Sequence, residues 1–317
     1  MALKAAVIGL GSMGTNHARV YSSLRSVELV GCADVSKNTS DVASKFNTNF
    51  YTNYRELLKK ESPALVSICV PTTLHKKVAL DCFSQNSSAL VEKPISADSK
   101  SAQTIISAAK KAKAKLMVGH VERFNPVIQG IKKYLSSSSS KIFSINIERV
   151  GPIPPRIKDV GVVLDLGTHD IDLATFLTGQ KVKQVYCTTN SYTNPSKHED
   201  SAHLTLELSN NISVSITTNW LTPYKQRTIE VITDKSVVQG NLKEQELIEF
   251  TKNGNSYLSN SIEVNKSEPL VLELQSFADS VKNNTTPQIT GEDGLYALKI
   301  AELCLRSAKE KKAIKVK

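Results

Sequence analysis

Long apolar runs are missing from this chain of 317 residues. None reaches the ~18 residues that a helix needs to span a bilayer, so we expect no membrane partner. At the N-terminus, a single lysine and a short apolar stretch of strand length do not fit a secretory signal peptide. A hydrophobic content of 40% is enough for a large core. We therefore expect a soluble, cytoplasmic protein of one or two domains.

Cysteine pairs and metal-ligand spacings are also missing. The cysteines are odd in number and widely spaced, with no C-x-x-C pair: Cys32, Cys69, Cys82, Cys187 and Cys304. This usage is typical of buried small hydrophobes in a reducing compartment. The histidines have no zinc-ligand spacing either. We therefore expect no disulfide framework and no metal site.

Aromatic side chains are scarce, at 6% of the residues, and this bears on the net charge of +10. Much of the basic excess lies in Lys110–Lys115 and in the tail Arg306–Lys317, where no aromatic side chains are interleaved to stack bases. We therefore expect no nucleic-acid partner. A basic field would draw in an anionic ligand such as a nucleotide sugar, and a solvated lysine-rich surface is the alternative explanation.

What the N-terminus does contain is a strand, a glycine turn and a helix in succession. The apolar run Leu3–Ile8 leads into Gly9-Leu10-Gly11-Ser12-Met13-Gly14, and a helical stretch follows over Thr15–Leu24. In this pattern the first glycine allows the turn, the second lets the backbone approach a pyrophosphate, and the third lets helix and strand pack closely. The spacing predicts a dinucleotide site at the N-terminus of the helix.

An acidic residue follows the next predicted strand at the spacing that a ribose requires. The apolar run Val27–Ala33 ends at Asp34, 20 positions after Gly14. A carboxylate there accepts hydrogen bonds from the adenosine ribose and repels a 2′-phosphate. This predicts NAD as the cofactor, with NADP as the alternative because Ser36 and Lys37 soften the preference.

Two further motifs supply groups for acid/base chemistry. Glu92-Lys93-Pro94 follows a predicted strand, and its X-Pro bond is compatible with a cis peptide. Asp165 and His169 are four residues apart and would share one face of a helix. Oxidation of a secondary alcohol requires loss of the hydroxyl proton, which an imidazole can accept near neutral pH, and a lysine stabilises the developing charge. The alternative for His169 is a satisfied interfacial histidine.

Taken together, the motifs resemble those of the glucose-fructose oxidoreductase / inositol dehydrogenase (Gfo/Idh/MocA) family. The resemblance covers nearly the whole chain. It is carried by Gly9–Gly14, Val70-Pro71-Thr72-Thr73-Leu74-His75, Glu92-Lys93-Pro94, Arg123-Phe124-Asn125-Pro126 and Asp165-Leu166-Gly167-Thr168-His169-Asp170-Ile171-Asp172. Within the family, 119–126 and 151–156 are most similar to the archaeal UDP-N-acetylglucosamine 3-dehydrogenases.

The resemblance implies roles for individual residues. His169 would be the base, Lys93 would orient the hydroxyl, and Asp165 would position the substrate or tune Lys93. The implied cofactor-binding residues are Gly9, Gly11, Ser12, Met13, Gly14, Asp34, Pro71, Thr72, His75, Glu92 and Lys93. The implied substrate-binding residues are Arg123, Arg156, Asp165 and His169. Arg123 either lines the cleft or ties down a helix. Arg156 is a candidate anchor for a diphosphate, and a solvated loop cation is the alternative. Asp172 is expected either to support the residues that contact the substrate or to pack the helix.

The element pattern predicts two domains, residues 1–121 and 122–317. Up to about His120, short apolar runs alternate with helical stretches, which predicts a parallel doubly wound Rossmann sheet. The expected strands there are Leu3–Ile8, Val27–Ala33, Ala64–Val70, Ala89–Val91 and Leu116–Val118. The second domain is expected to be α+β, with a flexible connector at Ser136–Ser140 and a largely antiparallel open sheet. A catalytic helix is expected from about Val162 to Leu177, with Gly179 as its terminator. An open sheet exposes an edge and a face that a second copy of the chain can cover, so a homo-oligomer, either a dimer or a tetramer, is expected.

The leading hypothesis is an NAD-dependent dehydrogenase that acts on a ring hydroxyl of a nucleotide sugar. One alternative keeps the fold and changes the substrate to a free sugar, an inositol or an imine. Another is a redox sensor that binds NAD and has lost its chemistry. The complete set of Lys93, Asp165 and His169 argues against the sensor, which has no need of all three.

Overall fold

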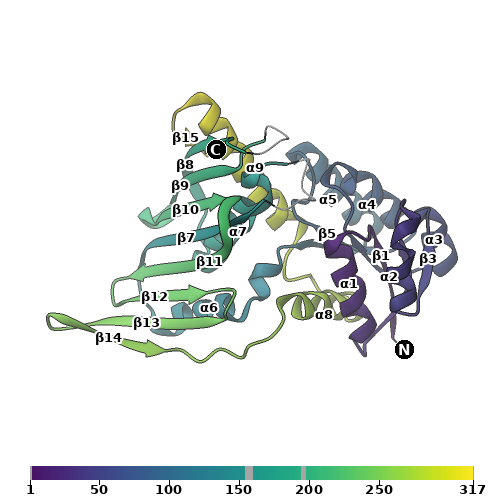
Figure 1. Ribbon diagram of the computed structural model, residues 1–317, viewed down its shortest axis with the longest axis horizontal. Coiled ribbons are helices and arrows are strands. Elements are labelled where there is room, and N and C mark those ends of the chain that lie inside the picture. Colours follow the sequence, from purple (N-terminus) through teal and green to yellow (C-terminus); the bar gives the residue numbers. More distant parts are fainter. Residues whose placement is uncertain (1, 154–159, 194–197, 317) are drawn as a thin grey trace. The chain divides into compact units, whose positions relative to one another are not determined.

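The computed structural model describes residues 2–153, 160–193 and 198–316. The chain divides into two compact units, shown in Figure 1. The first unit comprises Met1–Val121 and Leu270–Tyr296, and the second comprises Glu122–Pro269 and Ala297–Lys317. None of the helices in the described part of the chain is long and apolar enough to cross a membrane.

The first unit is built on a six-stranded parallel sheet in the order β3-β2-β1-β4-β5-β6. Its strands are β1 (Leu3–Ile8), β2 (Val27–Ala33), β3 (Asn49–Tyr51), β4 (Leu65–Ile68), β5 (Ser88–Glu92) and β6 (Leu116–Gly119). The intervening helices are α1 (Ser12–Ser23), α2 (Ser40–Lys45), α3 (Tyr54–Glu61), α4 (His75–Ser84) and α5 (Ser99–Ala112). Every residue of β4, β5 and β6 is buried, as expected for parallel strands covered on both faces. This confirms the predicted Rossmann sheet.

Residues 270–296 also belong to the first unit, although the sequence placed them in the second domain. They form α8 (Pro269–Lys282) and the first turns of α9 (Gly291–Glu310). Figure 1 shows α8 beside α1, and the Gln275 amide and Ser26 hydroxyl are joined by hydrogen bonds of 3.1 and 3.2 Å. The apolar face of α8, which includes Leu274 and Phe277, is buried. An apolar helix face is stable only when it is packed against other apolar side chains, which explains why α8 packs in the first unit.

The second unit is built on a nine-stranded sheet in the order β14-β13-β12-β11-β7-β10-β9-β8-β15. Its strands are β7 (Ile142–Pro152), β8 (Val182–Asn190), β9 (Ser201–Leu208), β10 (Ser213–Asn219), β11 (Leu221–Thr233), β12 (Ser236–Asn241), β13 (Glu246–Asn253), β14 (Ser256–Ser261) and β15 (Ile314–Lys315). All neighbours pair antiparallel except β7 and β10, which are parallel. The largely antiparallel sheet is therefore confirmed. Side chains along β9 alternate between buried and exposed, so one face carries the core.

Helix α6 (Pro126–Ser138) extends into the segment expected to be a flexible connector. Serine is a poor helix former because its hydroxyl competes for backbone groups, and that is why the prediction stopped early. Here the hydroxyls of Ser136 and Ser137 donate to the carbonyls of Lys132 and Tyr134 inside the helix. The helix instead ends at Ser138, and its C-cap residue, Ser139, has a left-handed φ of 49°.

Candidate active site

The glycine turn between β1 and α1 has the geometry that a dinucleotide needs. Gly9 has a φ of +91°, and a Cβ there would lie 2.6 Å from the Cys69 carbonyl oxygen. A Cβ on Gly14 would lie 1.7 Å from the carbonyl oxygen of Gly9, so only glycine lets α1 pack this closely. At Gly11 a Cβ would meet no atom of the described chain within 4 Å, which leaves the backbone accessible to a pyrophosphate. The space around the three glycines is compatible with the three tasks, and their contact with a dinucleotide stays a prediction.

The N-terminus of α1 is suited to bind phosphate. The helix begins with Ser12 and Met13, and its first turn contains no acidic side chain. Among the described residues, no side chain caps the helix at Gly11. Uncapped N–H groups and the positive end of the helix dipole attract anions. This end of the first unit therefore fits the diphosphate of NAD.

Asp34 lies at the carboxyl end of β2 and is tied to the glycine turn. Its Oδ2 accepts a hydrogen bond from the Leu10 N–H at 2.7 Å, and its Oδ1 accepts one from Ser36 N–H at 2.8 Å. The Gly9 N–H also donates to the Ala33 carbonyl at 2.8 Å. The carboxylate is held where a dinucleotide fold binds the adenosine ribose. A ribose hydroxyl fits this acceptor better than the 2′-phosphate of NADP does, because two negative charges repel.

Two loops that follow β4 and β5 are joined by a buried histidine. Pro71 is exposed and Thr72 is buried in the first loop. His75 is 1% exposed, with Nδ1 3.0 Å from the Pro94 carbonyl oxygen and Nε2 2.9 Å from the Val70 carbonyl oxygen. Burial lowers the pKa of His75. His75 therefore fixes the first loop to the second, which contains Lys93.

Glu92 and Lys93 stand at the carboxyl end of β5. The Lys93 side chain is half-buried, and the Lys93–Pro94 peptide is cis. Glu92 is 7% exposed, and its Oε1 lies 3.0 Å from Nε2 of the wholly buried His17. Burial alone would raise the pKa of Glu92, but His17 and Lys93 hold it below its ordinary value. Sequence reasoning gave His17 no role, although its place three residues after Gly14 puts it on the inner face of α1.

In the second unit, Asp165 and His169 lie where a π-helical turn passes into an α-helix. The π turn spans Val163–Gly167, and α7 runs over Thr168–Thr178. The expected helix was continuous, and no pattern in the sequence marks the π turn, a feature with i→i+5 hydrogen bonds that is frequent at functional sites. Gly179 ends α7 with a φ of +67°, as predicted. Asp165 and His169 are 9% and 8% exposed, so each is largely withdrawn from water.

A buried charge network supports α7 from inside the second unit. Arg149 donates to Asp170 Oδ1 and to Glu122 Oε1, both at 2.8 Å, and Arg227 donates to the same oxygen of Glu122 at 3.0 Å. Burial alone would raise the pKa of Glu122, but Arg149 and Arg227 hold it below its ordinary value. Burial raises the pKa of Asp170 to about 6 despite the opposing effect of Arg149. The network fixes the helix that carries His169.

Arg123 and Asp172 form a second support. Arg123 donates to both carboxylate oxygens of Asp172, at 2.8 and 2.6 Å, and its guanidinium lies 4.9 Å from the centre of the Phe176 ring. Of the two roles expected for Arg123, these contacts favour tying down the helix, and Asp172 packs it as expected. Arg156 lies outside the described residues, so its predicted role stays a prediction.

One group of side chains in the described ranges has ligand atoms close enough for a metal ion. The atoms belong to His17, Cys69 and Glu92 and lie within 4.8 Å of one another. Burial raises the pKa of the Cys69 thiol well above its ordinary range, and Glu92 and Glu273 add to this effect. His17 is already hydrogen-bonded to Glu92 and Ser67, and we describe these contacts as a hydrogen-bonded cluster.

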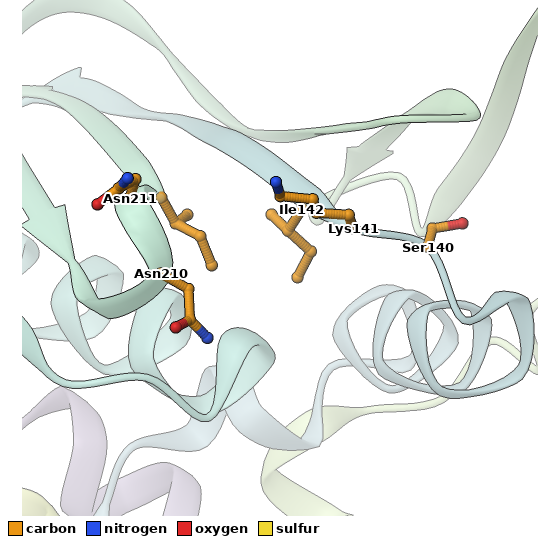
Figure 2. A pocket seen from close by; sticks show the side chains of 6 residues that line it. Ser140, Lys141, Ile142, Asn210 and Asn211 are labelled. Carbon is orange, nitrogen blue, oxygen red and sulfur yellow. The ribbon is translucent and has the colours of Figure 1, made fainter.

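A pocket in the second unit contains none of the predicted site residues. Figure 2 shows that its lining comes from the start of β7 and from the turn between β9 and β10. The lining residues are Ser140, Lys141, Ile142, Asn210, Asn211 and Ile212. The one charged group in this set, Lys141, lies over the Phe143 ring at 5.9 Å. We assign the pocket no role.

Comparison with known proteins identifies both parts of the chain. Residues 3–120 match the Gfo/Idh/MocA oxidoreductase family, NAD-binding Rossmann fold, and residues 155–317 match the C-terminal alpha/beta domain of the same family. The myo-inositol 2-dehydrogenase of Thermotoga maritima is 25% identical over 99% of this chain and 98% of its own. The UDP-N-acetylglucosamine 3-dehydrogenase of Acidithiobacillus ferrooxidans is 31% identical over 56% of this chain and 55% of its own.

Solved structures show the same fold. The A. ferrooxidans enzyme superposes with a TM-score of 0.89 at 22% identity, covering 98% of each chain. An oxidoreductase from Agrobacterium radiobacter, in complex with NAD⁺, L-tartaric acid and magnesium, superposes with a TM-score of 0.88 at 18% identity, covering 99% of this chain and 98% of its own. The glycine turn, the N-terminus of α1 and the Asp34 carboxylate fit NAD, and both domains of the family match this chain. The chain therefore belongs to the Gfo/Idh/MocA family of NAD-binding oxidoreductases.

Proposed function

We propose that the protein is a dehydrogenase that oxidises a secondary hydroxyl of a sugar, and that a nucleotide sugar is its substrate. The observation that carries the proposal is the combination of a glycine turn, helix N-terminus and Asp34 that fit NAD with two pairs of buried or half-buried acid/base groups. Glu92 and Lys93 follow β5 in the first unit, and Asp165 and His169 lie at the start of α7 in the second. Bound NAD would accept the hydride at nicotinamide C4.

The chain's own residues would handle the proton and the charge. The imidazole of His169 accepts the hydroxyl proton, because its ordinary pKa is suited to proton transfer near neutral pH. The ammonium of Lys93 orients the hydroxyl and stabilises the charge that develops on its oxygen. Asp165 positions the substrate or tunes Lys93. Burial of Asp165 and His169 strengthens both effects by excluding water.

Two observations favour a nucleotide sugar. The relative from A. ferrooxidans is a UDP-N-acetylglucosamine 3-dehydrogenase. The net charge of +10 also favours an anionic ligand. An inositol or free sugar is the second candidate, because the T. maritima relative, which matches 99% of the chain, is a myo-inositol 2-dehydrogenase.

The direct test is NADH formation, followed by absorbance, with UDP-N-acetylglucosamine, other nucleotide sugars, free sugars and inositols. We expect the highest kcat/KM with a UDP sugar, and we expect free UDP to compete with the substrate but not with NAD. Arg156→Ala should weaken binding of the UDP sugar by about 1.5–3 kcal/mol, the range for loss of a hydrogen bond to a charged group. If free sugars turn over as well as nucleotide sugars, or if UDP does not compete, the nucleotide-sugar assignment is wrong and the dehydrogenase assignment stands.

A further inference from the structure

A buried chain of hydrogen bonds links α1 to the turn that contains Lys93. The Nε2 of His17 lies 3.0 Å from Glu92 Oε1, and its Nδ1 lies 2.9 Å from the Ser67 hydroxyl. That hydroxyl is in turn 2.9 Å from the Tyr21 hydroxyl. His17, Tyr21 and Ser67 are wholly buried. These hydrogen bonds therefore connect the helix that follows the glycine turn to the carboxylate that precedes Lys93.

The position of Glu92 is closely determined. A buried carboxylate is strongly destabilising unless it is paired, and His17 supplies that partner. The second carboxylate oxygen, Oε2, accepts a hydrogen bond from the Lys93 N–H at 3.3 Å. On the neighbouring strand, a Cβ on Gly119 would lie 3.1 Å from the Glu92 carboxylate, so glycine leaves room for this side chain. The Glu92 carboxylate thus holds the backbone from which the Lys93 side chain extends.

The charge of Glu92 also acts on Lys93. The two groups are close enough for the positive charge of Lys93 to lower the pKa of Glu92. While the carboxylate is held by His17, it is not free to turn toward the ammonium group. Loss of the imidazole would leave Lys93 as the cation available to Glu92, which would pull the ammonium away from a substrate oxygen.

We propose that His17 is a positioning residue for Lys93 and acts through Glu92. The proposal rests on the function proposed above, because Lys93 must act on the substrate for its position to affect turnover. His17 is wholly buried and is joined to the candidate site through Glu92, so we assign it a positioning role and not a catalytic one.

The test compares His17→Ala with Tyr21→Phe. Tyr21→Phe is the matched control, because it removes a buried hydrogen bond from the same helix and the same chain but leaves the His17–Glu92 contact in place. For His17→Ala we expect kcat to fall roughly 10- to 100-fold, as for other displaced catalytic groups, with KM for NAD changed less than about threefold. For Tyr21→Phe we expect kcat within about twofold of the wild type. Equal losses of kcat in both variants would mean a general effect of α1 and would overturn the proposal.

A second readout does not depend on the substrate. The rate of acetylation of Lys93 by acetic anhydride, measured by mass spectrometry against the exposed Lys100, reports how freely the Lys93 amine loses its proton. We expect this rate to fall at least about threefold in His17→Ala, because a released Glu92 carboxylate stabilises the ammonium form, and to stay unchanged in Tyr21→Phe. If no sugar is oxidised, the acetylation rates still test the role of His17. An unchanged or higher rate in His17→Ala would overturn it.

Two further measurements test the role of His17 if the first variant does not fold or if the protein binds zinc. If His17→Ala does not fold, Glu92→Gln keeps the shape of the side chain, removes its charge and should also lower kcat. Zinc content of the purified protein is measured by mass spectrometry. One equivalent of zinc per chain that disappears in Cys69→Ala would show that His17 and Glu92 are metal ligands, and would overturn the positioning role.

Discussion

Two candidate cofactor-binding residues of the first unit, Asp34 and His75, are held by contacts with the backbone of neighbouring loops. Asp34 accepts hydrogen bonds from Leu10 N–H and Ser36 N–H, and His75 lies between the carbonyls of Val70 and Pro94. Such contacts fix side chains before a ligand arrives, which lowers the entropy lost on binding. The glycine turn at Gly9, Gly11 and Gly14 could be predicted because its geometry depends on a few adjacent residues. The His17–Glu92 contact joins residues 75 positions apart, and no spacing in the sequence shows which side chains meet at such a distance.

Asp34→Ser should raise KM for NAD and improve the use of NADP. The substitution removes an acceptor for the ribose hydroxyls and a charge that repels a 2′-phosphate. The measurement is kcat/KM with each cofactor at saturating substrate. Asp34→Asn is the control, since it keeps one acceptor oxygen for the Leu10 N–H and removes only the charge, and it should lie between the wild type and Asp34→Ser. An unmoved cofactor preference would show that Asp34 does not contact the ribose.

Lys93→Met and His169→Ala should each lower kcat by on the order of 10²-fold or more, with little change in NADH affinity. Both side chains are proposed to act on the reacting oxygen, so the double variant should lose little more than the worse single variant. Turnover is followed by NADH absorbance and affinity by NADH fluorescence. Lys100→Met and His203→Ala, which alter exposed side chains, are the controls and should leave kcat unchanged. Near-normal turnover in either catalytic variant would remove that residue from the chemistry.

At the scale of elements, the predictions succeeded where burial repeats with a regular period. β1 and β2 have the bounds predicted from their apolar runs, and Gly179 ends α7 as expected. The elements that were missed are short or exposed. β3 and β15 have only three and two residues, and every residue of β14 is exposed, so none has an apolar pattern to read. The π turn before α7 and the charge network beneath it depend on contacts between distant elements.

The charge network leads us to predict how the stability of the fold depends on pH. Because the pKa of Asp170 is raised from its ordinary 3.8 to about 6 in the folded protein, the folded state holds this proton more tightly than the unfolded state does. Asp170 therefore stabilises the fold below its ordinary pKa, and that contribution is lost as the pH rises to about 6. Its Oδ2 has no hydrogen-bond partner among the described residues, which agrees with a carboxylate that is difficult to ionise.

Asp170→Asn cannot ionise, so it should not share this loss. Between pH of about 4 and about 7, the free energy of unfolding of Asp170→Asn should improve relative to the wild type by roughly 2–3 kcal/mol, at ~1.4 kcal/mol for each pH unit of difference. Urea unfolding is followed by the fluorescence of Trp220, the only tryptophan in the sequence, which is buried in the second unit. Glu246→Gln, at an exposed carboxylate of the same unit, should show no such gain. A gain equal in both variants would contradict the prediction.

At the scale of the whole molecule, the division of labour follows the family architecture, with the dinucleotide-binding sheet in the first unit and the open sheet in the second. The boundary after Val121 could be read from the change of pattern near that point. The return of residues 270–296 to the first unit could not, because an amphipathic helix does not specify which sheet it will cover. The open sheet of the second unit leads to the last prediction.

The face of that sheet opposite its buried core carries both polar and apolar side chains. Pairing places Ile232 beside Val237, and Val237 beside Phe250, so these half-buried apolar side chains form a continuous patch across β11, β12 and β13. The Phe250 ring also contacts the exposed Tyr257 ring of β14, with their centres 5.9 Å apart. Contiguous apolar patches of this kind mark interaction sites. We therefore predict that the protein forms a homo-oligomer through this face.

Sedimentation velocity should show a dimer or tetramer for the wild type and a smaller species for the double variant Val237→Glu/Phe250→Glu. Burying two carboxylates against a partner would oppose association by several kcal/mol, whereas each side chain remains half-exposed in the single chain. Phe143→Glu is the matched control. Phe143 is 46% exposed but, by the alternation of β7, points to the face that carries Ile145, so this variant should keep the wild-type mass. A monomeric wild type, or equal dissociation of both variants, would show that this face is not the interface, and the apolar patch would then need another partner.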